Sequence, residues 1–83
     1  MNQVLMRAVA ESAAFVGLSG DDVIQSDAAV AYLEALGSTM KGLTEAEREI
    51  FARYMAQLAT EESAAGRVDR ADFLTSLCED LGL

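Results

Sequence analysis

The stretch that decides the fold is residues 2–16, NQVLMRAVAESAAFV. At about 100° per residue, its apolar side chains cover well over half of a helical circumference. The apolar face is centred on Met1, Leu5, Val9, Ser12 and Val16, with Val4, Ala8 and Phe15 on one flank and Met6 and Ala13 on the other. A narrow strip is left for water, namely Gln3, Arg7, Ala10, Glu11 and Ala14. We expect such a helix to be packed on two sides, by its own chain or by another molecule.

The whole sequence has the size and composition of one helical domain, residues 1–83. Hydrophobic residues make up 52% of the chain and proline is absent, so nothing interrupts helices from within. No long run alternates β-branched and polar residues, as a half-buried strand would. The fold class predicted is all-α, without linkers or repeats.

Capping residues divide the rest of the chain into three further helices. The second has Ser26 or Asp27 as its N-cap, and the third has Thr44, where Glu47 completes a capping box. The fourth begins with Asp69 as its N-cap. Each helix is expected to stop at a glycine, in chain order Gly17, Gly42, Gly66 and Gly82, and Gly17 is the residue best able to take the left-handed conformation past the end of the first helix. Residues 19–24, with Ser19 as N-cap, allow at most one short helical turn.

Each of these helices carries an apolar stripe at helical spacing. The stripes are Ala29, Val30, Leu33, Leu36 and Met40 in the second helix, Ile50, Phe51, Tyr54, Met55 and Leu58 in the third, and Phe73, Leu74, Leu77, Cys78 and Leu81 in the fourth. Gly37 lies within the second stripe, where a missing side chain lets another backbone approach. The prediction is a compact bundle of four helices with the first helix at its centre.

The charge of the chain is strongly one-sided, with fourteen acidic and six basic side chains and a net charge of −8. Such a surface repels nucleic acid and anionic lipid, and it attracts basic proteins. The longest charge-free stretch is far too short to cross a bilayer, and no signal peptide is visible, so a cytoplasmic location is expected. The acidity also has a simpler interpretation, which is solubility.

Residues suited to catalysis or metal binding are scarce. Histidine is absent and Cys78 is the single cysteine, which removes the usual general base, the usual zinc ligand sets and an internal disulfide. The adjacent carboxylates in the chain fall in caps or on faces predicted to be wet, where nothing raises a pKa. We therefore expect no enzymatic activity, cofactor or metal site.

One segment, residues 61–72, resembles the loop of an EF-hand. Gly66 stands at the sixth position, Val68 at the eighth and Asp69 at the ninth. The first, third and fifth positions hold Glu61, Ser63 and Ala65, and the twelfth holds Asp72, in place of the ligands of that family. Calcium binding is not expected, because a helix end, a turn and a capped helix start explain the same residues.

Two hypotheses of function follow. The first is a protein that neutralises or regulates a basic partner, in the manner of an immunity protein or antitoxin that inhibits a toxin or another cationic enzyme. Its candidate interface residues are Asp21, Asp22, Asp27, Tyr32, Glu34, Glu45, Glu49, Tyr54, Glu61 and Glu62. The alternative is a homo-oligomeric structural or adaptor protein, for example a homodimer, whose subunits share the apolar first helix.

Overall fold

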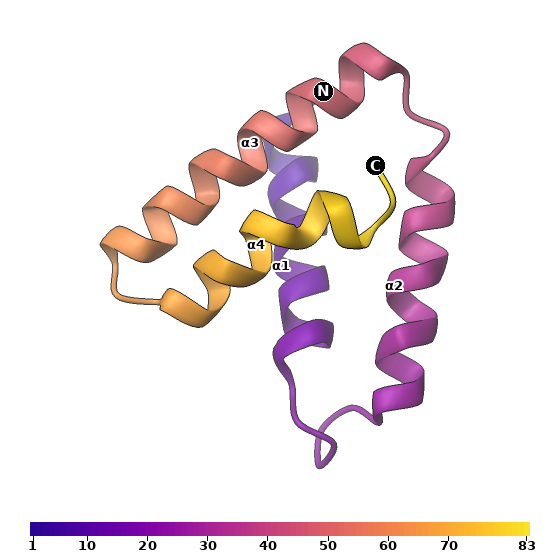
Figure 1. The fold of residues 1–83 in the computed structure, drawn as a ribbon, viewed down its shortest axis with the longest axis vertical. Helices are drawn as coiled ribbons and strands as arrows, with labels where there is room; N and C mark the ends of the chain where they lie inside the picture. Colours follow the sequence, from indigo (N-terminus) through magenta and orange to yellow (C-terminus); the bar gives the residue numbers. More distant parts are fainter.

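The computed structural model describes residues 1–83 and contains four helices and no strands (Figure 1). The helices are α1 (Gln3–Leu18), α2 (Ser26–Met40), α3 (Glu45–Ala64) and α4 (Val68–Asp80). The prediction of an all-α bundle of four helices is confirmed. None of the helices is both long enough and apolar enough to pass through a bilayer.

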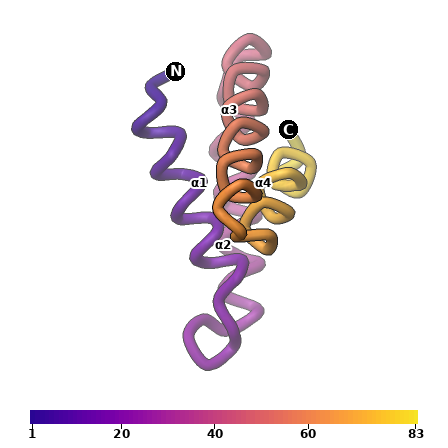
Figure 2. Tube along the Cα trace, turned by 90° about the vertical axis from the view of Figure 1, so that its left-hand side faces the viewer, coloured from indigo at the N-terminus to yellow at the C-terminus, as the bar shows by residue number.

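The fold is built on one antiparallel pair of helices, α3 and α4. α3 and α4 lie side by side and form the most extensive contact, and α1 crosses behind both of them (Figure 1). α1 packs against each of the other three helices, but they do not surround it as predicted (Figure 2). Figure 2 shows that α1 forms one edge of the molecule while α4 and the C-terminus lie at the opposite edge.

The core is formed where α1 covers the pair α3 and α4. Its most deeply buried large side chains are Met6, Phe51, Met55 and Leu77. The predicted stripe of α3 is buried apart from Ile50, and in α4 the stripe leaves only Phe73 and Cys78 half-buried. The periodicity of α3 and α4 therefore identified the inward faces of both helices.

In α1, by contrast, the predicted orientation is wrong. The face that packs inward consists of Met6, Ala10, Ala13 and Ala14, two of which were assigned to the wet strip. The large apolar side chains Val4, Leu5 and Phe15 point to solvent instead. Small residues turn inward because they let helices approach closely. At Gly17, an added Cβ would lie 2.3 Å from Cε1 of Phe73.

Three helix ends agree with their sequence signals. The capping box of α3 is present, because the Thr44 hydroxyl accepts from the Glu47 amide and the Glu47 carboxylate accepts from the Thr44 amide. The glycines Gly66 and Gly82 have φ of 82° and 78° and end α3 and α4 as predicted.

Three other predicted helix ends are wrong in detail. α1 continues through Gly17 to Leu18, and Ser19 follows its C-terminus, where its hydroxyl donates to the Phe15 carbonyl. α2 has Gln25 as its N-cap, because the Ser26 hydroxyl donates to Asp21 instead of capping. α4 begins one residue before Asp69, so Asp69 lies in its first turn. The end of α2 at Met40, with Lys41 as its C-cap, agrees with the predicted stop at Gly42. Residues 19–24 form one hydrogen-bonded turn, which agrees with the prediction of at most one short helical turn there.

α2 is the least buried helix and lies at the side of the bundle (Figure 1). Only Gly37 and Met40 are buried, while Leu33 and Leu36 are half-buried and Val30 is exposed, against the prediction. The prediction for Gly37 is confirmed, since the backbone of Leu81 lies directly against it. This contact closes α2 onto the end of α4.

Candidate functional site

The residues predicted to bind a partner lie in separate parts of the molecule. The first group surrounds the connection between α1 and α2 and continues along α2: Asp21, Asp22, Asp27, Tyr32 and Glu34. Glu45 and Glu49 lie in the first turns of α3, and Glu61 and Glu62 lie at its far end. Glu49 and Glu61 are roughly 18 Å apart at 1.5 Å per residue. The ten residues therefore do not form one surface.

Tyr54, expected to be an exposed aromatic anchor, is buried. Only 9% of its surface is accessible, and it belongs to the hydrophobic core cluster with Met6 and Phe51. It lies inside because α1 covers this side of α3. Tyr54 is therefore not the exposed aromatic side chain that the sequence predicted.

Glu62, expected on the wet surface, is buried beneath two arginine side chains with which it forms ion pairs. Its side chain is 11% exposed, accepts a hydrogen bond from Arg67 and lies 3.6 Å from Nε of Arg70. The hydrogen bond from Arg67 lowers the pKa of the Glu62 carboxyl and raises that of the guanidinium. Glu62 holds the turn between α3 and α4 together, so it is not a free acidic contact for a partner.

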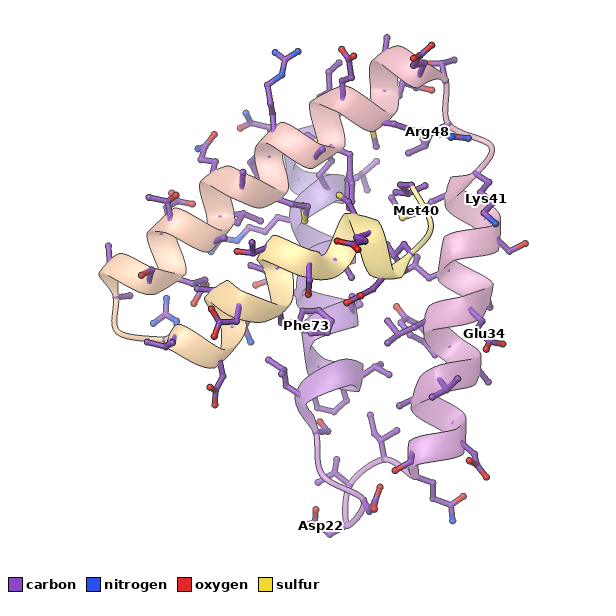
Figure 3. All side chains as sticks on the ribbon, in the orientation of Figure 1. Asp22, Glu34, Met40, Lys41, Arg48 and Phe73 are labelled. Atoms are coloured by element: carbon purple, nitrogen blue, oxygen red, sulfur yellow. The ribbon has the colours of Figure 1, made fainter.

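The three predicted contacts of α2 do not lie on one face of the helix. Asp27 and Glu34 are seven residues apart and share a face, whereas Tyr32 and Glu34 are about 200° apart around the axis. Figure 3 shows Glu34 on the side of α2 and Asp22 at the tip of the connection. The acidic stripe of α2 therefore does not include Tyr32.

A groove between α2 and the end of α4 is lined by acidic residues from both helices. Its volume is about 560 Å³, and its lining consists of Val30, Leu33, Glu34, Gly37, Ser38, Lys41, Asp80, Leu81 and Gly82. Glu34 comes from α2, and Asp80 comes from the last turn of α4. The Ser76 hydroxyl donates to Asp80 at 3.2 Å, which orients this carboxylate.

The groove combines an apolar lining with carboxylates, which suits one class of group. Val30 and Leu33 offer apolar contact, while Glu34 and Asp80 supply negative charge and Lys41 is the single cation. An arginine or lysine side chain matches this combination, because its aliphatic stem packs on apolar surface while its charged head meets carboxylates. Sequence reasoning found Glu34 but missed Asp80 as its neighbour. The available signal was Gly37, which predicted a close approach without saying of which segment.

A second groove lies between α3 and α4, and it carries little chemistry. It has a volume of about 640 Å³ and is lined mainly by small residues, with Asp72 and Cys78 as its titratable groups. Burial raises the pKa of the Cys78 thiol, which leaves it protonated at neutral pH. Cys78 has the properties of a small half-buried core residue rather than a nucleophile.

No group of three or more carboxylate or thiol side chains comes together as a metal would require. In the segment that resembles an EF-hand loop, the Glu62 carboxylate is occupied by Arg67 and Arg70. Guanidinium groups at this point compete with a cation for the same oxygens.

The outer face of α1 is the largest run of exposed apolar side chains along one helix. Val4 is 76% exposed, Leu5 64% and Phe15 59%, and Met1 and Leu18 extend the run at its two ends. Scattered exposed apolar residues are ordinary, but a continuous stripe on one helix is a feature of interaction surfaces. The sequence identified this stripe, although it placed it inside.

Comparison with known proteins adds no relative. No protein-family model, no curated protein and no solved structure matches this chain.

Proposed function

We propose that this protein is a small acidic protein-binding module of the cytoplasm that neutralises or regulates a basic protein partner, in the manner of an immunity protein or antitoxin. The observation that carries the proposal is the groove between α2 and the end of α4, whose lining includes the acidic Glu34 and Asp80 and the apolar Val30 and Leu33. A basic side chain of the partner enters this groove, and the protein acts by occupying the partner's surface rather than by catalysis.

The charge distribution supports the same proposal. Glu34 follows, along α2, a group of acidic residues formed by Asp21, Asp22 and Asp27. Lys41 is the single basic residue that lines the groove. A net charge of −8 on a small body raises the encounter rate with a cationic protein, and salt screens this attraction. The exposed valine at position 30 gives the contact an apolar centre with an acidic rim.

The experiment compares two charge reversals on the full chain. Immobilised wild-type protein, Glu34→Lys and Glu61→Lys are used to capture basic proteins from the native host, and binding of the retained protein is then measured by calorimetry at low and high salt. Both variants change the net charge equally, but Glu61 is exposed and makes no ion pair, at the far end of α3 from the groove. We expect Glu34→Lys to weaken binding at least tenfold and Glu61→Lys to weaken it only slightly.

Other outcomes contradict the proposal in different ways. Equal weakening by both reversals means that the partner responds to net charge alone, without the groove. If binding is insensitive to salt, or if no basic protein is retained at low salt, the proposal of a basic partner is wrong. A second candidate function is the homo-oligomer, and it is favoured by the exposed apolar side chains Val4, Leu5 and Phe15 on the outer face of α1.

A further inference from the structure

α2 contributes very little to the hydrophobic core. The core cluster contains 12 buried residues, and Met40 is the only one that α2 supplies. All the others belong to α1, α3 and α4, or to Leu81 directly after α4. The stability of a segment depends on the buried contacts that it makes, so α1, α3 and α4 retain nearly the whole core among themselves when α2 is not in contact with them.

The contacts that hold α2 in place are concentrated at its C-terminal end. Gly37 lies against the backbone of Leu81, and Met40 enters the core. The Arg48 guanidinium donates at 2.7 Å to the carbonyl of Lys41, the C-cap of α2. No residue of α2 before Gly37 is buried. The helix is therefore attached to the other helices at one end.

No ion pair joins α2 to the other helices. The ion pairs of the chain lie within α1, within α3 and at the turn between α3 and α4. α2 itself carries two acidic residues, Asp27 and Glu34, and no basic residue. The rest of a chain with a net charge of −8 is acidic as well, so long-range electrostatics oppose the docking of α2.

The two connections of α2 have the properties of hinges. Residues 19–25 and 41–44 are mostly exposed, and each connection contains a glycine, Gly20 and Gly42. The N-cap of α2, Gln25, makes no side-chain capping hydrogen bond. A hinge requires only a few such residues, because they absorb the change in backbone angles while the packed helices stay intact.

We propose that α2 detaches from the bundle as one unit while α1, α3 and α4 remain folded around their core. The undocked state is a minor state of the free chain, in exchange with the docked state. One wall of the acidic groove belongs to α2 and the other to the end of α4, so the groove exists only while α2 is docked. This regulates the proposed function, on which this consequence alone rests, because the apparent affinity for a basic partner falls with the fraction of undocked chains.

The first test is amide hydrogen exchange of the full free chain, followed by NMR in low concentrations of urea. A detached helix of 15 residues is only marginally stable in water, so the amides of α2 exchange once it leaves the bundle. After correction for intrinsic rates, we expect the amides of Gly37 and Met40 to exchange about a hundredfold faster than those of Phe51 and Leu77. The α2 amides should share one dependence on urea, shallower than that of global unfolding. If Gly37 and Met40 exchange as slowly as Phe51 and Leu77, with the same dependence on urea, the proposal is overturned.

A core variant separates the opening of α2 from global unfolding. Leu58 is a buried residue in the second half of α3, and its contacts persist when α2 detaches. We expect Leu58→Val to raise the exchange rates of the slowest amides of α3 and α4 about fivefold and to leave those of α2 unchanged. An equal increase in α2 means that α2 opens only when the whole chain unfolds, which overturns the proposal.

A matched pair of arginine variants tests the attachment of α2. Arg48→Gln removes the hydrogen bond to the Lys41 carbonyl, and we expect it to raise the exchange rates of α2 about fivefold. Arg53→Gln removes the same charge from an exposed ion pair with Glu49 and should have little effect on α2. Equal effects of the two variants contradict this attachment. All of these measurements use the free chain, so they decide the proposal whether or not a basic partner binds the groove.

Discussion

The carbonyl oxygen of Leu81 lies 2.6 Å from the position that a Cβ atom on residue 37 would occupy. Only glycine fits there, because the atom in the way belongs to the backbone and cannot rotate aside. The contact joins α2 to the end of α4, two elements separated by the whole of α3 in the sequence. It also forms part of the groove that contains Glu34 and Asp80.

The first prediction concerns this contact. Gly37→Ala removes a helical glycine, which by itself stabilises a helix by about 1 kcal/mol. Overpacking against the Leu81 backbone costs about 1–3 kcal/mol, so we expect the variant to be less stable than wild type by up to about 2 kcal/mol. Urea unfolding followed by circular dichroism measures the change. Ser38→Ala, at an exposed position next in α2, should change stability by less than about 0.5 kcal/mol. A variant Gly37→Ala that is more stable than wild type contradicts the contact.

A second prediction concerns the acid sensitivity of the turn between α3 and α4. The folded-state pKa of Glu62 is lowered by its hydrogen bond from Arg67, so its stabilising contribution is present above the unfolded-state pKa. That contribution is lost as the pH falls through the folded-state pKa. We expect Glu62→Gln to lower the melting temperature at pH 7 and to differ progressively less from wild type below about pH 4.5. Thermal unfolding between pH 7 and pH 3 measures the difference.

The control for this prediction is its exposed neighbour. Glu61 makes no ion pair, so Glu61→Gln should leave the melting temperature at pH 7 nearly unchanged. If Glu62→Gln keeps the same difference from wild type at every pH, the ion pair with Arg67 and Arg70 is not the source of the stability.

Local signals predicted much of the fold because they act within one helix. The Thr44 and Glu47 capping box needs only four consecutive residues, and Gly66 ends α3 by its own conformational freedom. The caps at Ser19 and Asp69 were mispredicted, because a local signal alone does not decide where a helix begins. Each has the right residue type, but the hydroxyl of Ser19 is taken by the Phe15 carbonyl, and α4 begins earlier than Asp69.

The candidate site was only half predictable, because its two carboxylates come from helices that only tertiary packing brings together. Glu34 and Asp80 come from different helices, and the close contact of Gly37 with Leu81 brings those helices together. Tyr54 and Glu62 were misplaced on the surface for a related reason. Periodicity located the apolar arc of α3 but could not tell that α1 would cover Tyr54 or that Arg67 would pair with Glu62.

The orientation of α1 is the largest error, and it has a physical cause. Summing hydrophobicity around a helix ranks large apolar side chains above alanine, whereas close packing of crossed helices favours alanine and glycine. Ala10 and Ala13 therefore face the core, and Leu5 and Phe15 face outward. The stripe of large apolar side chains predicted that this face of α1 is buried, but the rest of the chain does not cover it.

The last prediction separates the two orientations of α1 with a matched pair of substitutions. The sequence pattern places Ala8 inside and Ala10 at the surface, and the structure reverses both positions. Ala10→Leu forces extra volume into a packed contact, and we expect it to lower the free energy of unfolding by about 1–3 kcal/mol. Ala8→Leu adds the same atoms to an exposed position and should change it by less than about 0.5 kcal/mol. Urea unfolding at the same low protein concentration compares the two variants. If Ala8→Leu is the more destabilising of the pair, α1 packs through its large apolar residues, and the orientation of α1 described above is wrong.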